Sequence, residues 1–347
     1  MARILFRTDG GAGIGLGHLQ RCVSLATALQ RAGALCFFLV HGDEAAAARV
    51  AGAGFACRLL AADEGSGVRS TIETAREWEC DGAVVDSYLT GAPLLSSLRD
   101  SGLFVAAIAD LAADAFDAHL VVGFGPHAHA AGYRSARGDT RFLLGPRYTI
   151  LRPEYWAVPL MPLRERVRTL LVTTGGADPQ GVMPSWIVAV DAIDAPFDIT
   201  AIVGPFFTDP DAVHDAAAST HRTVRVVDSP KVTRPMQAMA DIAVSAAGQT
   251  IYELAALGVP TVAAEIAPNQ RPQLDAFAAL GAMIDAGATA DPATTQRITG
   301  AVARLIGDVG ERRALSETAR GAVDRRGAMT VAAEILAAIA THAKGTR

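Results

Sequence analysis

Short apolar runs alternate with longer amphipathic stretches along most of this sequence. In the first half, the apolar runs that predict β-strands lie at residues 2–7, 35–40, 82–86, 103–108 and 118–122. Stretches with the helical spacing of apolar residues lie between them, near residues 18–32, 43–52, 68–79 and 91–101. Strands that are apolar almost throughout and alternate with helices are typical of a parallel sheet covered by helices on both faces.

The alternation stops in the middle of the chain and then starts again. Residues 152–168 contain three prolines among charged and aromatic residues, a composition that fits neither a helix nor a strand. The predicted strands of the second series lie near residues 169–174, 198–203, 223–227, 241–245 and 259–264. Its predicted helices lie near residues 180–193, 210–219, 231–240, 249–257 and 270–280. From about residue 291 only amphipathic helices follow, the last of them near residues 328–343.

The two series predict two Rossmann-like α/β domains, residues 1–153 and residues 154–347, and the final helix could pack back on the first domain. A chain of 347 residues has room for both, because a single core rarely grows beyond roughly 250 residues. Open parallel sheets bind ligands beyond the carboxyl ends of their strands. We therefore expect two parallel sheets that face a cleft, with a ligand-binding edge on each side of it.

Composition narrows the classes of partner. Hydrophobic residues make up 50% of the sequence and charged residues 19%, which allows a large buried core. The formal net charge is −5 and no cluster of Lys and Arg stands out, so neither nucleic acid nor an anionic membrane is expected as a main partner. A bound anion would be held mainly by backbone N–H groups and a few arginines. No obligate protein partner is evident.

The expected location is the cytoplasm. Cys22, Cys36, Cys57 and Cys80 all lie in the first quarter of the chain without Cys-x-x-Cys spacing, which favours reduced core thiols. The sequence begins with a predicted strand and lacks the basic and apolar segments of a signal peptide. No apolar stretch reaches the ~20 residues that a membrane-spanning helix needs.

A glycine-rich segment after the first predicted strand is the most distinctive local feature. Residues 10–17 read Gly-Gly-Ala-Gly-Ile-Gly-Leu-Gly and lead directly into a predicted helix at His18. Glycines let backbone N–H groups approach a ligand, and a helix N-terminus favours negative charge, so Gly13, Gly15 and Gly17 are candidate binding positions. The imidazole of His18 would point into the cleft, where it could act as a general base near neutral pH; it could equally cap the helix.

Two other chemistries are not favoured for this loop. A nicotinamide or flavin cofactor calls for Gly-x-Gly-x-x-Gly, whereas these glycines occupy alternate positions, and Asp43 comes too late after the second strand to hold a ribose. No Asp-x-Asp pair or histidine cluster lies near a glycine loop. We therefore expect neither a metal nor another cofactor.

Small-residue loops also follow strands of the second predicted domain. Gly175 and Gly176 follow the strand near residues 169–174 and precede a helix expected to begin with Asp178 as its N-cap and Pro179 at its first position. Alone, this pattern could be no more than a well-capped helix.

A second loop of this kind follows the strand near residues 241–245. The positions that follow that strand are Ala247, Gly248, Gln249 and Thr250. A helix opens here, and its first N–H groups can hold a diphosphate. About one turn further on, Glu253 can reach a ribose diol.

A polar pair follows the next strand. Asn269 and Gln270 offer uncharged donors and acceptors for sugar hydroxyls or phosphates. Each of these signals is weak alone, but three glycine-rich strand ends in two Rossmann-like domains, with a polar pair at a fourth, are a much more specific combination.

Several motifs together resemble one family. In chain order they are Phe-Arg-Thr-Asp at residues 6–9, Ile-Gly-Leu-Gly-His at 14–18 followed by Arg-Cys at 21–22, Val-Asp-Ser-Tyr at 85–88, Leu-Gly-Pro-Arg-Tyr at 144–148, Gly-Gly-Ala-Asp-Pro at 175–179 and Leu-Gly-Val-Pro at 257–260. The combination resembles the UDP-2,4-diacetamido-2,4,6-trideoxy-β-L-altropyranose hydrolases of pseudaminic acid biosynthesis and the related spore-coat polysaccharide proteins. Their wider relatives are inverting GT-B glycosyltransferases. The resemblance extends, in order, from the first strand to about residue 280.

The resemblance implies a GT-B-like enzyme that binds a UDP-sugar. UDP would bind to the second domain and the sugar would face the glycine loop of the first. His18 would activate water, which displaces UDP from the anomeric carbon with inversion and without a metal. Tyr88 matches a tyrosine at the sugar, and Asn269 matches an asparagine at the sugar and phosphates.

Three further residues are candidates in the same segments. Asp9 and Asp86, at the ends of their strands, could position His18 or bind sugar hydroxyls, and each could equally cap a loop. Arg21 lies in the matched segment after the glycine loop and is a candidate contact to the substrate.

Two departures from the family concern positions that would border the substrate. The family usually has a histidine where this chain has Ser87, and often Gly-Gly-Ser-Thr where this chain has Ala-Gly-Gln-Thr at residues 247–250. The identity of the sugar is therefore open. The predicted function is a UDP-sugar hydrolase; the alternatives are a GT-B glycosyltransferase, in which an acceptor hydroxyl replaces water, and a nucleotide-sugar-binding protein without chemistry of its own.

Overall fold

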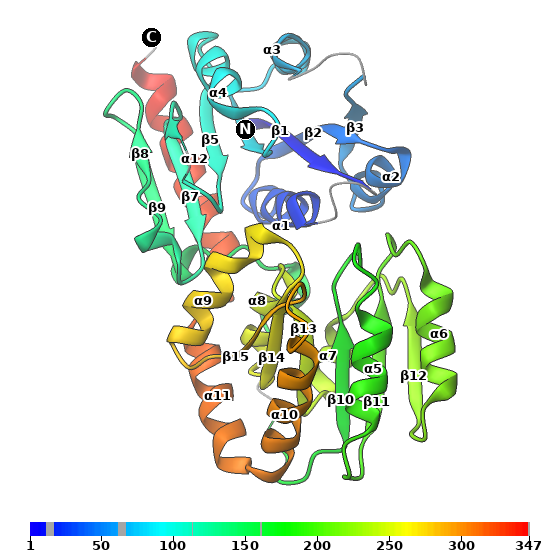
Figure 1. Ribbon diagram of the computed structural model, residues 1–347. Helices are drawn as coiled ribbons and strands as arrows, with labels where there is room; N and C mark the ends of the chain where they lie inside the picture. Colours follow the sequence, from blue (N-terminus) through cyan, green and yellow to red (C-terminus); the bar gives the residue numbers. More distant parts are fainter. Residues whose placement is uncertain (12–16, 62–66, 113, 160–161, 346–347) are drawn as a thin grey trace. The chain divides into compact units, whose positions relative to one another are not determined.

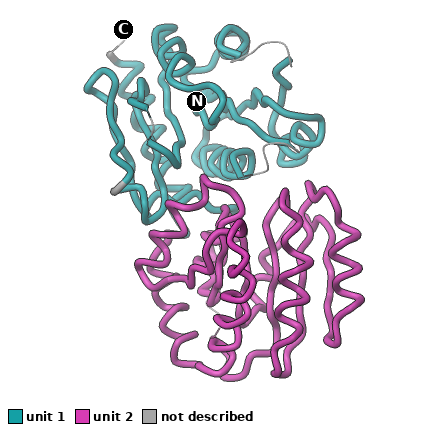
Figure 2. The backbone as a smooth tube through the Cα atoms, viewed as in Figure 1, with its two compact units in different colours: residues 1–153, 325–347 teal, residues 154–324 magenta. Residues whose placement is uncertain are grey.

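Two units, each built on its own parallel β-sheet, make up the chain. The computed structural model describes residues 1–11, 17–61, 67–112, 114–159 and 162–345. Unit 1 comprises Met1–Pro153 and Arg325–Arg347, and unit 2 comprises Glu154–Asp324 (Figure 2).

The sheet of unit 1 has seven strands in the order β3-β2-β1-β4-β5-β7-β9, and all neighbouring strands are parallel. The strands are β1 (Arg3–Gly10), β2 (Leu35–Gly42), β3 (Ala56–Leu59), β4 (Gly82–Asp86), β5 (Phe104–Ile108), β7 (Leu120–Phe124) and β9 (Arg141–Gly145). A separate short parallel pair joins β6 (Ala115–Phe116) to β8 (Arg134–Ser135). Every residue of β4, β5 and β7 is buried, as expected for central strands covered on both faces.

Helices connect these strands (Figure 1). They are α1 (Gly17–Arg31), α2 (Glu44–Gly52), α3 (Val68–Glu77), α4 (Gly91–Asp100), the 3-10 turns η1 (Ala128–Ala130) and η2 (Pro146–Tyr148), and α12 (Gly327–Gly345). The C-terminal helix α12 packs on α1 and η2. Gly327 makes this approach possible, because a Cβ atom there would lie 2.3 Å from the Thr149 carbonyl oxygen. Arg141 and Glu334 add an ion pair of 2.8 Å between β9 and α12.

The sheet of unit 2 has six parallel strands in the order β12-β11-β10-β13-β14-β15. The strands are β10 (Thr169–Thr173), β11 (Asp198–Val203), β12 (Val224–Asp228), β13 (Ile242–Ala246), β14 (Thr261–Glu265) and β15 (Ile284–Ala288). The helical elements are η3 (Pro153–Tyr155), which begins at the boundary, α5 (Met183–Asp191), α6 (Pro210–Ser219), α7 (Arg234–Met239), α8 (Thr250–Leu257), η4 (Pro268–Gln270), α9 (Arg271–Ala279), α10 (Thr294–Gly307) and α11 (Val309–Gly321).

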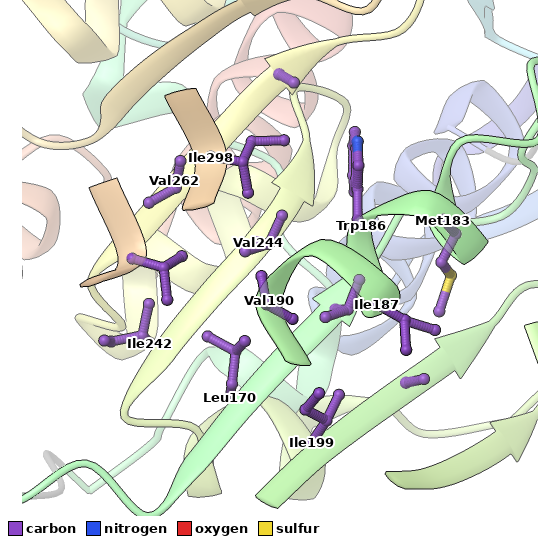
Figure 3. Packing of buried hydrophobic residues seen from close by; sticks show 14 of the residues in the cluster. Leu170, Met183, Trp186, Ile187, Val190, Ile199, Ile242, Val244, Val262 and Ile298 are labelled. Atoms are coloured by element: carbon purple, nitrogen blue, oxygen red, sulfur yellow. The ribbon is translucent and has the colours of Figure 1, made fainter. Parts of the chain in front are cut away.

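The core of unit 2 forms where α5 and α10 cover this sheet (Figure 3). Trp186, Ile187 and Val190 of α5 are buried against apolar residues of the central strands, among them Leu170 and Val244. Truncating a large apolar side chain in such a core costs about 2–5 kcal/mol, so this packing holds the strand ends in place.

Both sheets reverse their winding beside their first strand. In unit 1, β1 lies between β2 and β4; in unit 2, β10 lies between β11 and β13. At such a switch point the connections leave toward opposite sides and open a crevice beyond the carboxyl ends of the two central strands, where α/β sheets bind ligands. The loops after β1 and β4, and after β10 and β13, are the candidate binding elements.

Three edge strands were missed by the sequence pattern. β3, β9 and β15 each pair with a single neighbour at an edge of a sheet. The sequence Ala-Cys-Arg-Leu of β3 carries a charge, and Ile-Asp-Ala-Gly-Ala of β15 carries a charge and a glycine. An edge strand does not need to be apolar on both faces, so the apolar-run criterion does not detect it.

Candidate functional site

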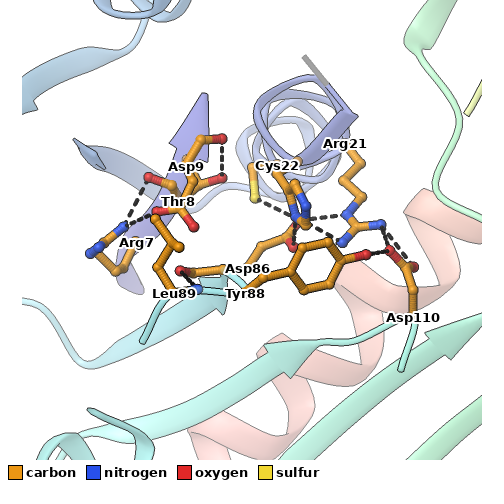
Figure 4. A network of polar contacts seen from close by, with 11 residues as sticks. Arg7, Thr8, Asp9, Arg21, Cys22, Asp86, Tyr88, Leu89 and Asp110 are labelled. Atoms are coloured by element: carbon orange, nitrogen blue, oxygen red, sulfur yellow. Dashed lines mark hydrogen bonds and ion pairs between the residues drawn. The ribbon is translucent and has the colours of Figure 1, made fainter. Parts of the chain in front are cut away.

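Three neighbouring strands of the first sheet, β1, β4 and β5, bring polar side chains to one edge. Asp86 is the last residue of β4, Asp110 follows β5, and His18 and Arg21 lie in the first two turns of α1, which follows β1. His18, Arg21 and Asp86 are buried with exposed fractions of 8%, 4% and 0%. Figure 4 shows the resulting polar network, which lies beside the switch point of unit 1.

His18 forms a hydrogen-bonded pair with Asp86. Nδ1 of His18 lies 2.6 Å from Oδ1 of Asp86. A carboxylate can only accept here, so the neutral imidazole carries its proton on Nδ1 and leaves Nε2 as the basic nitrogen. A carboxylate that fixes the tautomer of a histidine in this way is the arrangement that prepares an imidazole for general-base catalysis.

Arg21 is held between two carboxylates. Its Nε and Nη2 donate to Asp86 at 2.5 and 2.6 Å, and its Nη1 donates to both oxygens of Asp110 at 2.8 and 2.6 Å. The guanidinium also lies over the Phe124 ring, with 5.3 Å to the ring centroid.

Arg21 was expected to contact the substrate, and Asp86 to position His18, to bind sugar hydroxyls or to cap a loop. Both residues are buried and direct their polar atoms at one another. Asp86 accepts in addition from the thiol of Cys22 at 3.5 Å. Asp86 thus contacts His18 directly, and a contact from Arg21 or Asp86 to a ligand stays a prediction.

The charges in this network are stabilised by one another. Burial alone would raise the pKa of Asp86, but the charge of Arg21 and then His18 hold that pKa well below its usual range. Burial would likewise raise the pKa of Asp110, and Arg21 and His18 lower it. For Arg21, burial acts to lower the pKa, and the two carboxylates raise it well above its ordinary value. Both carboxylates and the guanidinium are thus ionised at neutral pH.

Tyr88 connects the exposed side of the network to Asp110. Its hydroxyl donates to Oδ2 of Asp110 at 2.8 Å, and its ring meets the His18 ring edge-on, with centroids 4.4 Å apart at 88°. With 46% of the residue exposed, Tyr88 is accessible to a ligand. The structure thus brings Tyr88 to His18, as a sugar-contacting role would require.

Asp9 lies apart from this group. Its Oδ1 accepts from Nη1 of Arg7 at 2.8 Å, and both residues are 1% exposed. Successive residues of a strand point to opposite faces. A Cβ on Gly10 would lie 3.1 Å from Leu19 of α1, so Gly10 faces α1 and Asp9 faces the other side. The geometry therefore favours Asp86 over Asp9 as the partner of His18, which corrects the expectation that either could position it.

The glycine loop is described only at its two ends. Gly13 and Gly15 lie outside the described residues, and Gly17 is the first residue of α1. Gly11 needs to be a glycine because its φ is +143° and a Cβ there would lie 2.7 Å from Oδ2 of Asp43.

Two loops meet at the switch point of unit 2. Gly175, after β10, has a φ of +90°, and a Cβ there would lie 3.3 Å from Oγ1 of Thr250, the first residue of α8. Gly176 is in close contact with Gly204, whose Cβ would lie 2.4 Å from the Gly176 carbonyl oxygen. Ala247 is buried, and Gly248 and Gln249 lead from it into α8. The predicted glycine positions and the start of α8 thus lie together.

Gln270 joins these loops, and Asn269 lies at the surface. A Cβ on Gly248 would lie 3.5 Å from Nε2 of Gln270, while Oε1 of Gln270 accepts from the Ile266 N–H at 3.0 Å. Asn269 is exposed in η4. The carbonyl end of Gln270 is therefore used within the fold, and its amide end points toward Gly248.

Glu253 lies in the first turn of α8 and is 5% exposed. Its Oε2 accepts from Nε2 of Gln237 at 3.1 Å and from the Tyr155 hydroxyl at 3.3 Å. Sequence reasoning missed these two partners, because they lie 16 and 98 residues away along the chain. A contact from Glu253 to a ribose stays a prediction.

The role of Asp178 is corrected in one respect. The helix α5 begins at Met183, not next to Asp178 as expected, and residues 179–181 form a turn. The carboxylate of Asp178 nevertheless accepts from the N–H groups of Val182 and Met183 at 3.1 and 2.9 Å. It caps the helix across an intervening turn.

The fold and these loops define a class. Two Rossmann-like units with parallel sheets and ligand loops at their switch points form the GT-B fold of glycosyltransferases, which confirms the predicted fold class. MurG from Acinetobacter baumannii shares it with a TM-score of 0.69 and 15% identity over 97% of this chain and 99% of that chain. The calicheamicin glycosyltransferase CalG4 has a TM-score of 0.64 and 17% identity over 98% of both chains. HepE from Anabaena, solved with UDP and glucose, has a TM-score of 0.61 and 15% identity over 97% of this chain and all of that chain.

Curated sequences add a distant relationship. The spore coat polysaccharide biosynthesis protein SpsG from Bacillus subtilis is 25% identical over 200 residues, 57% of this chain and 58% of that protein. An uncharacterized protein from Methanocaldococcus jannaschii is 21% identical over 271 residues, 75% of this chain and 55% of that protein. The chain spans little more than half the length of these curated relatives. No family model matches the sequence.

The described residues contain neither a metal-binding cluster nor a membrane-spanning helix. No group of three or more His, Cys, Asp or Glu side chains in the described ranges is arranged to hold a metal ion. Within that same part of the chain, every helix is too short or too polar to cross a membrane.

Proposed function

We propose that the protein is a glycosyltransferase that uses a nucleoside-diphosphate sugar as its donor, with His18 as the base that activates an acceptor hydroxyl. The observation that carries the proposal is the 2.6 Å hydrogen bond from Nδ1 of His18 to the buried Asp86, which leaves Nε2 as the basic nitrogen. The GT-B fold supports the donor class, because the similar structures include the glycosyltransferase CalG4 and HepE, which was solved with UDP and glucose.

The proposed reaction is a single displacement. The acceptor O–H gives its proton to Nε2 of His18 while its oxygen bonds to the anomeric carbon. The bond from that carbon to the diphosphate oxygen breaks, and the nucleoside diphosphate leaves with the electron pair. The configuration at the anomeric carbon is therefore inverted. Asp86 stabilises the imidazolium that forms, as a carboxylate does in other base-activated sites.

The nucleotide is assigned to unit 2. Residues 248–250 lead into the first turn of α8, where backbone N–H groups and the helix dipole favour a diphosphate. Gly175 lies beside this turn at Thr250, and the Gln270 amide lies beside it at Gly248. Glu253, one turn further, is the proposed acceptor for the ribose hydroxyls.

Hydrolysis of the donor is the second candidate. The motifs at residues 14–18 and 85–88 resemble those of UDP-sugar hydrolases, and the same base would serve a water molecule as well as a hydroxyl. The fold comparisons support transfer more than hydrolysis, because the similar structures include the calicheamicin glycosyltransferase CalG4 and a spinosyn rhamnosyltransferase. The nucleophile is thus the property that separates the two.

The test is release of nucleoside diphosphate from a panel of UDP- and TDP-linked sugars, with and without a panel of hydroxyl acceptors. Transfer predicts release that depends on the acceptor and a product in which the sugar is attached to it. Release of free sugar at the same rate without any acceptor would replace transfer by hydrolysis. If no donor is consumed under either condition while UDP binds, the protein is a binding protein and the proposal fails.

A further inference from the structure

Asp110 is a charged member of the site that the reaction described above does not use. It follows β5 and is joined to Arg21 by two hydrogen bonds, at 2.8 and 2.6 Å. It also accepts from Tyr88 at 2.8 Å. Asp110 has no hydrogen bond to His18 among those recorded for the described residues, so it can act on the base only by its charge and through Arg21.

The charge of Arg21 opposes protonation of His18, and the charge of Asp110 can offset this effect. Nη2 of Arg21 lies 3.0 Å from Nδ1 of His18, and both nitrogens share Oδ1 of Asp86. A guanidinium so close opposes a positive charge on the imidazole. It also neutralises the carboxylate on which that charge would depend.

Asp110 changes the net charge of the buried group around His18. Arg21, Asp86 and Asp110 carry one positive and two negative charges, a net charge of −1 that becomes zero when His18 takes up a proton. Without Asp110 the group would be neutral before proton uptake and positive after it. In a buried site of low dielectric, a net positive group is strongly disfavoured.

The other titratable groups that face this network are neutral at neutral pH. Burial, and next the charge of Asp86, raise the pKa of the Cys22 thiol well above its ordinary value. Burial lowers the pKa of His127, although Asp110 opposes the shift. The Tyr88 hydroxyl acts as a donor to Asp110. Burial, and next the charge of Asp110, raise the pKa of the Tyr133 hydroxyl well above its ordinary value. None of these four groups replaces the charge of Asp110.

We propose that Asp110 is a positioning residue that offsets the charge of Arg21, so that Asp86 can stabilise the proton that His18 takes from the nucleophile. The catalytic part of this inference rests on the proposed function, whereas the electrostatic part concerns only the free protein. Arg21 then holds both carboxylates in place, while the charge of Asp110 balances the charge of Arg21.

The test follows the protonation of the His18 ring by NMR in the full chain without substrate, with His18→Asn used to assign the signal. Asp110→Asn removes the charge and keeps the shape, and it should lower the pH at which His18 is half protonated by about one unit or more. Tyr88→Phe removes a hydrogen bond from Asp110 without changing its charge, and should shift that pH much less.

Two further variants are a matched control, which should not shift the His18 titration, and a variant that should shift it in the opposite direction. Asp139→Asn removes a carboxylate that pairs with Arg99 elsewhere in unit 1, and should leave the His18 titration unchanged. Arg21→Gln removes the guanidinium, and should raise the pH of half protonation. It keeps the inference testable if Asp110→Asn does not fold. An unchanged or higher midpoint in folded Asp110→Asn, or a lower one in Arg21→Gln, would overturn the proposal.

Turnover separates this inference from the proposed function. Where the protein consumes a donor, Asp110→Asn should lower kcat up to about tenfold and move the acidic limb of the kcat profile to lower pH. If Asp110 had a purely structural role, Asp110→Asn would lower kcat without moving the acidic limb of the pH profile of kcat. If the His18 titration shifts as expected but no donor is consumed, the electrostatic inference stands and the proposed function fails.

Discussion

At the scale of single residues, side chains far apart in the sequence determine what each site residue can do. Glu253 was expected to hold a ribose on the basis of its place in the first turn of a helix. The structure adds Gln237 and Tyr155, which both donate to Oε2 of Glu253. These two contacts orient the carboxylate, and they suggest how its ligand role can be tested separately from its structural role.

Glu253→Ala should weaken UDP binding by about 1.5–3 kcal/mol, the range of a hydrogen bond to a charged group. Pyrophosphate, which has no ribose, should bind to the variant nearly as well as to the wild type. Calorimetry with both ligands measures the difference. Tyr155→Phe is the control, because it removes one donor to the same carboxylate while the carboxylate itself remains. Equal losses for UDP and pyrophosphate would assign Glu253 a structural role.

The sequence identified most residues of the first-unit network but not its connections. His18, Arg21, Asp86 and Tyr88 were all recognised, because they lie in motifs next to strand ends. Asp110 was missed, since no glycine or motif marks it and its partner Arg21 is 89 residues away. Direct substrate contacts were expected of Arg21 and Asp86 because sequence spacing does not show that two side chains neutralise each other.

At the scale of elements, the central strands were predictable, whereas three of the four edge strands of the two large sheets were not. A central strand such as β5 (Phe104–Ile108) is apolar at every position because helices cover both faces of the sheet. The edge strands β3 and β15 carry charged residues and glycine, and only their pairing makes them strands. The start of α5 was placed too early because the turn after Asp178 has the composition of a helix N-terminus.

A half-buried histidine, His119, lies beside α12 within unit 1. Nδ1 of His119 accepts from the Val105 N–H at 3.0 Å, and its ring lies 4.7 Å from that of His342 of α12. Burial, followed by the charges of Arg99 and His342, lowers the pKa of His119 to about 4, while Asp139 and Asp117 act in the other direction.

Because the pKa of His119 is lower in the folded state than in the unfolded chain, the unfolded chain binds more protons between the two values. The free energy of unfolding should therefore be fully retained above about pH 6.5 and should decrease as the pH falls from there toward 4. Urea unfolding between pH 4 and 7 measures this decrease, and His119→Gln should make it smaller. An identical pH dependence in the wild type and His119→Gln would exclude His119 as its source.

At the scale of the whole molecule, each unit contributes one half of the proposed chemistry. Unit 2 supplies the loops assigned to the nucleotide, and unit 1 supplies the His18–Asp86 pair. The predicted two-domain GT-B fold is confirmed, and hydrolysis, the function first expected, has less support than glycosyl transfer. The sequence could not separate these two functions because one base can activate either nucleophile.

UDP should bind without a divalent metal. Its diphosphate is assigned to backbone N–H groups at the start of α8, which carry the positive end of the helix dipole. Calorimetry of UDP binding in EDTA should give the same affinity as in magnesium or manganese. Binding that is lost on chelation and restored by either metal would show that the diphosphate needs a cation.

The central claim is that His18 activates the nucleophile in a reaction of a nucleoside-diphosphate sugar. Its most direct test is kcat for release of the nucleoside diphosphate by the wild type and by His18→Asn, with UDP affinity measured in parallel. A general base contributes about 10²–10⁴-fold, so kcat should fall by that factor in His18→Asn, while UDP affinity stays the same. An unchanged kcat, or a loss of activity explained by an equal loss of UDP affinity, would contradict the account.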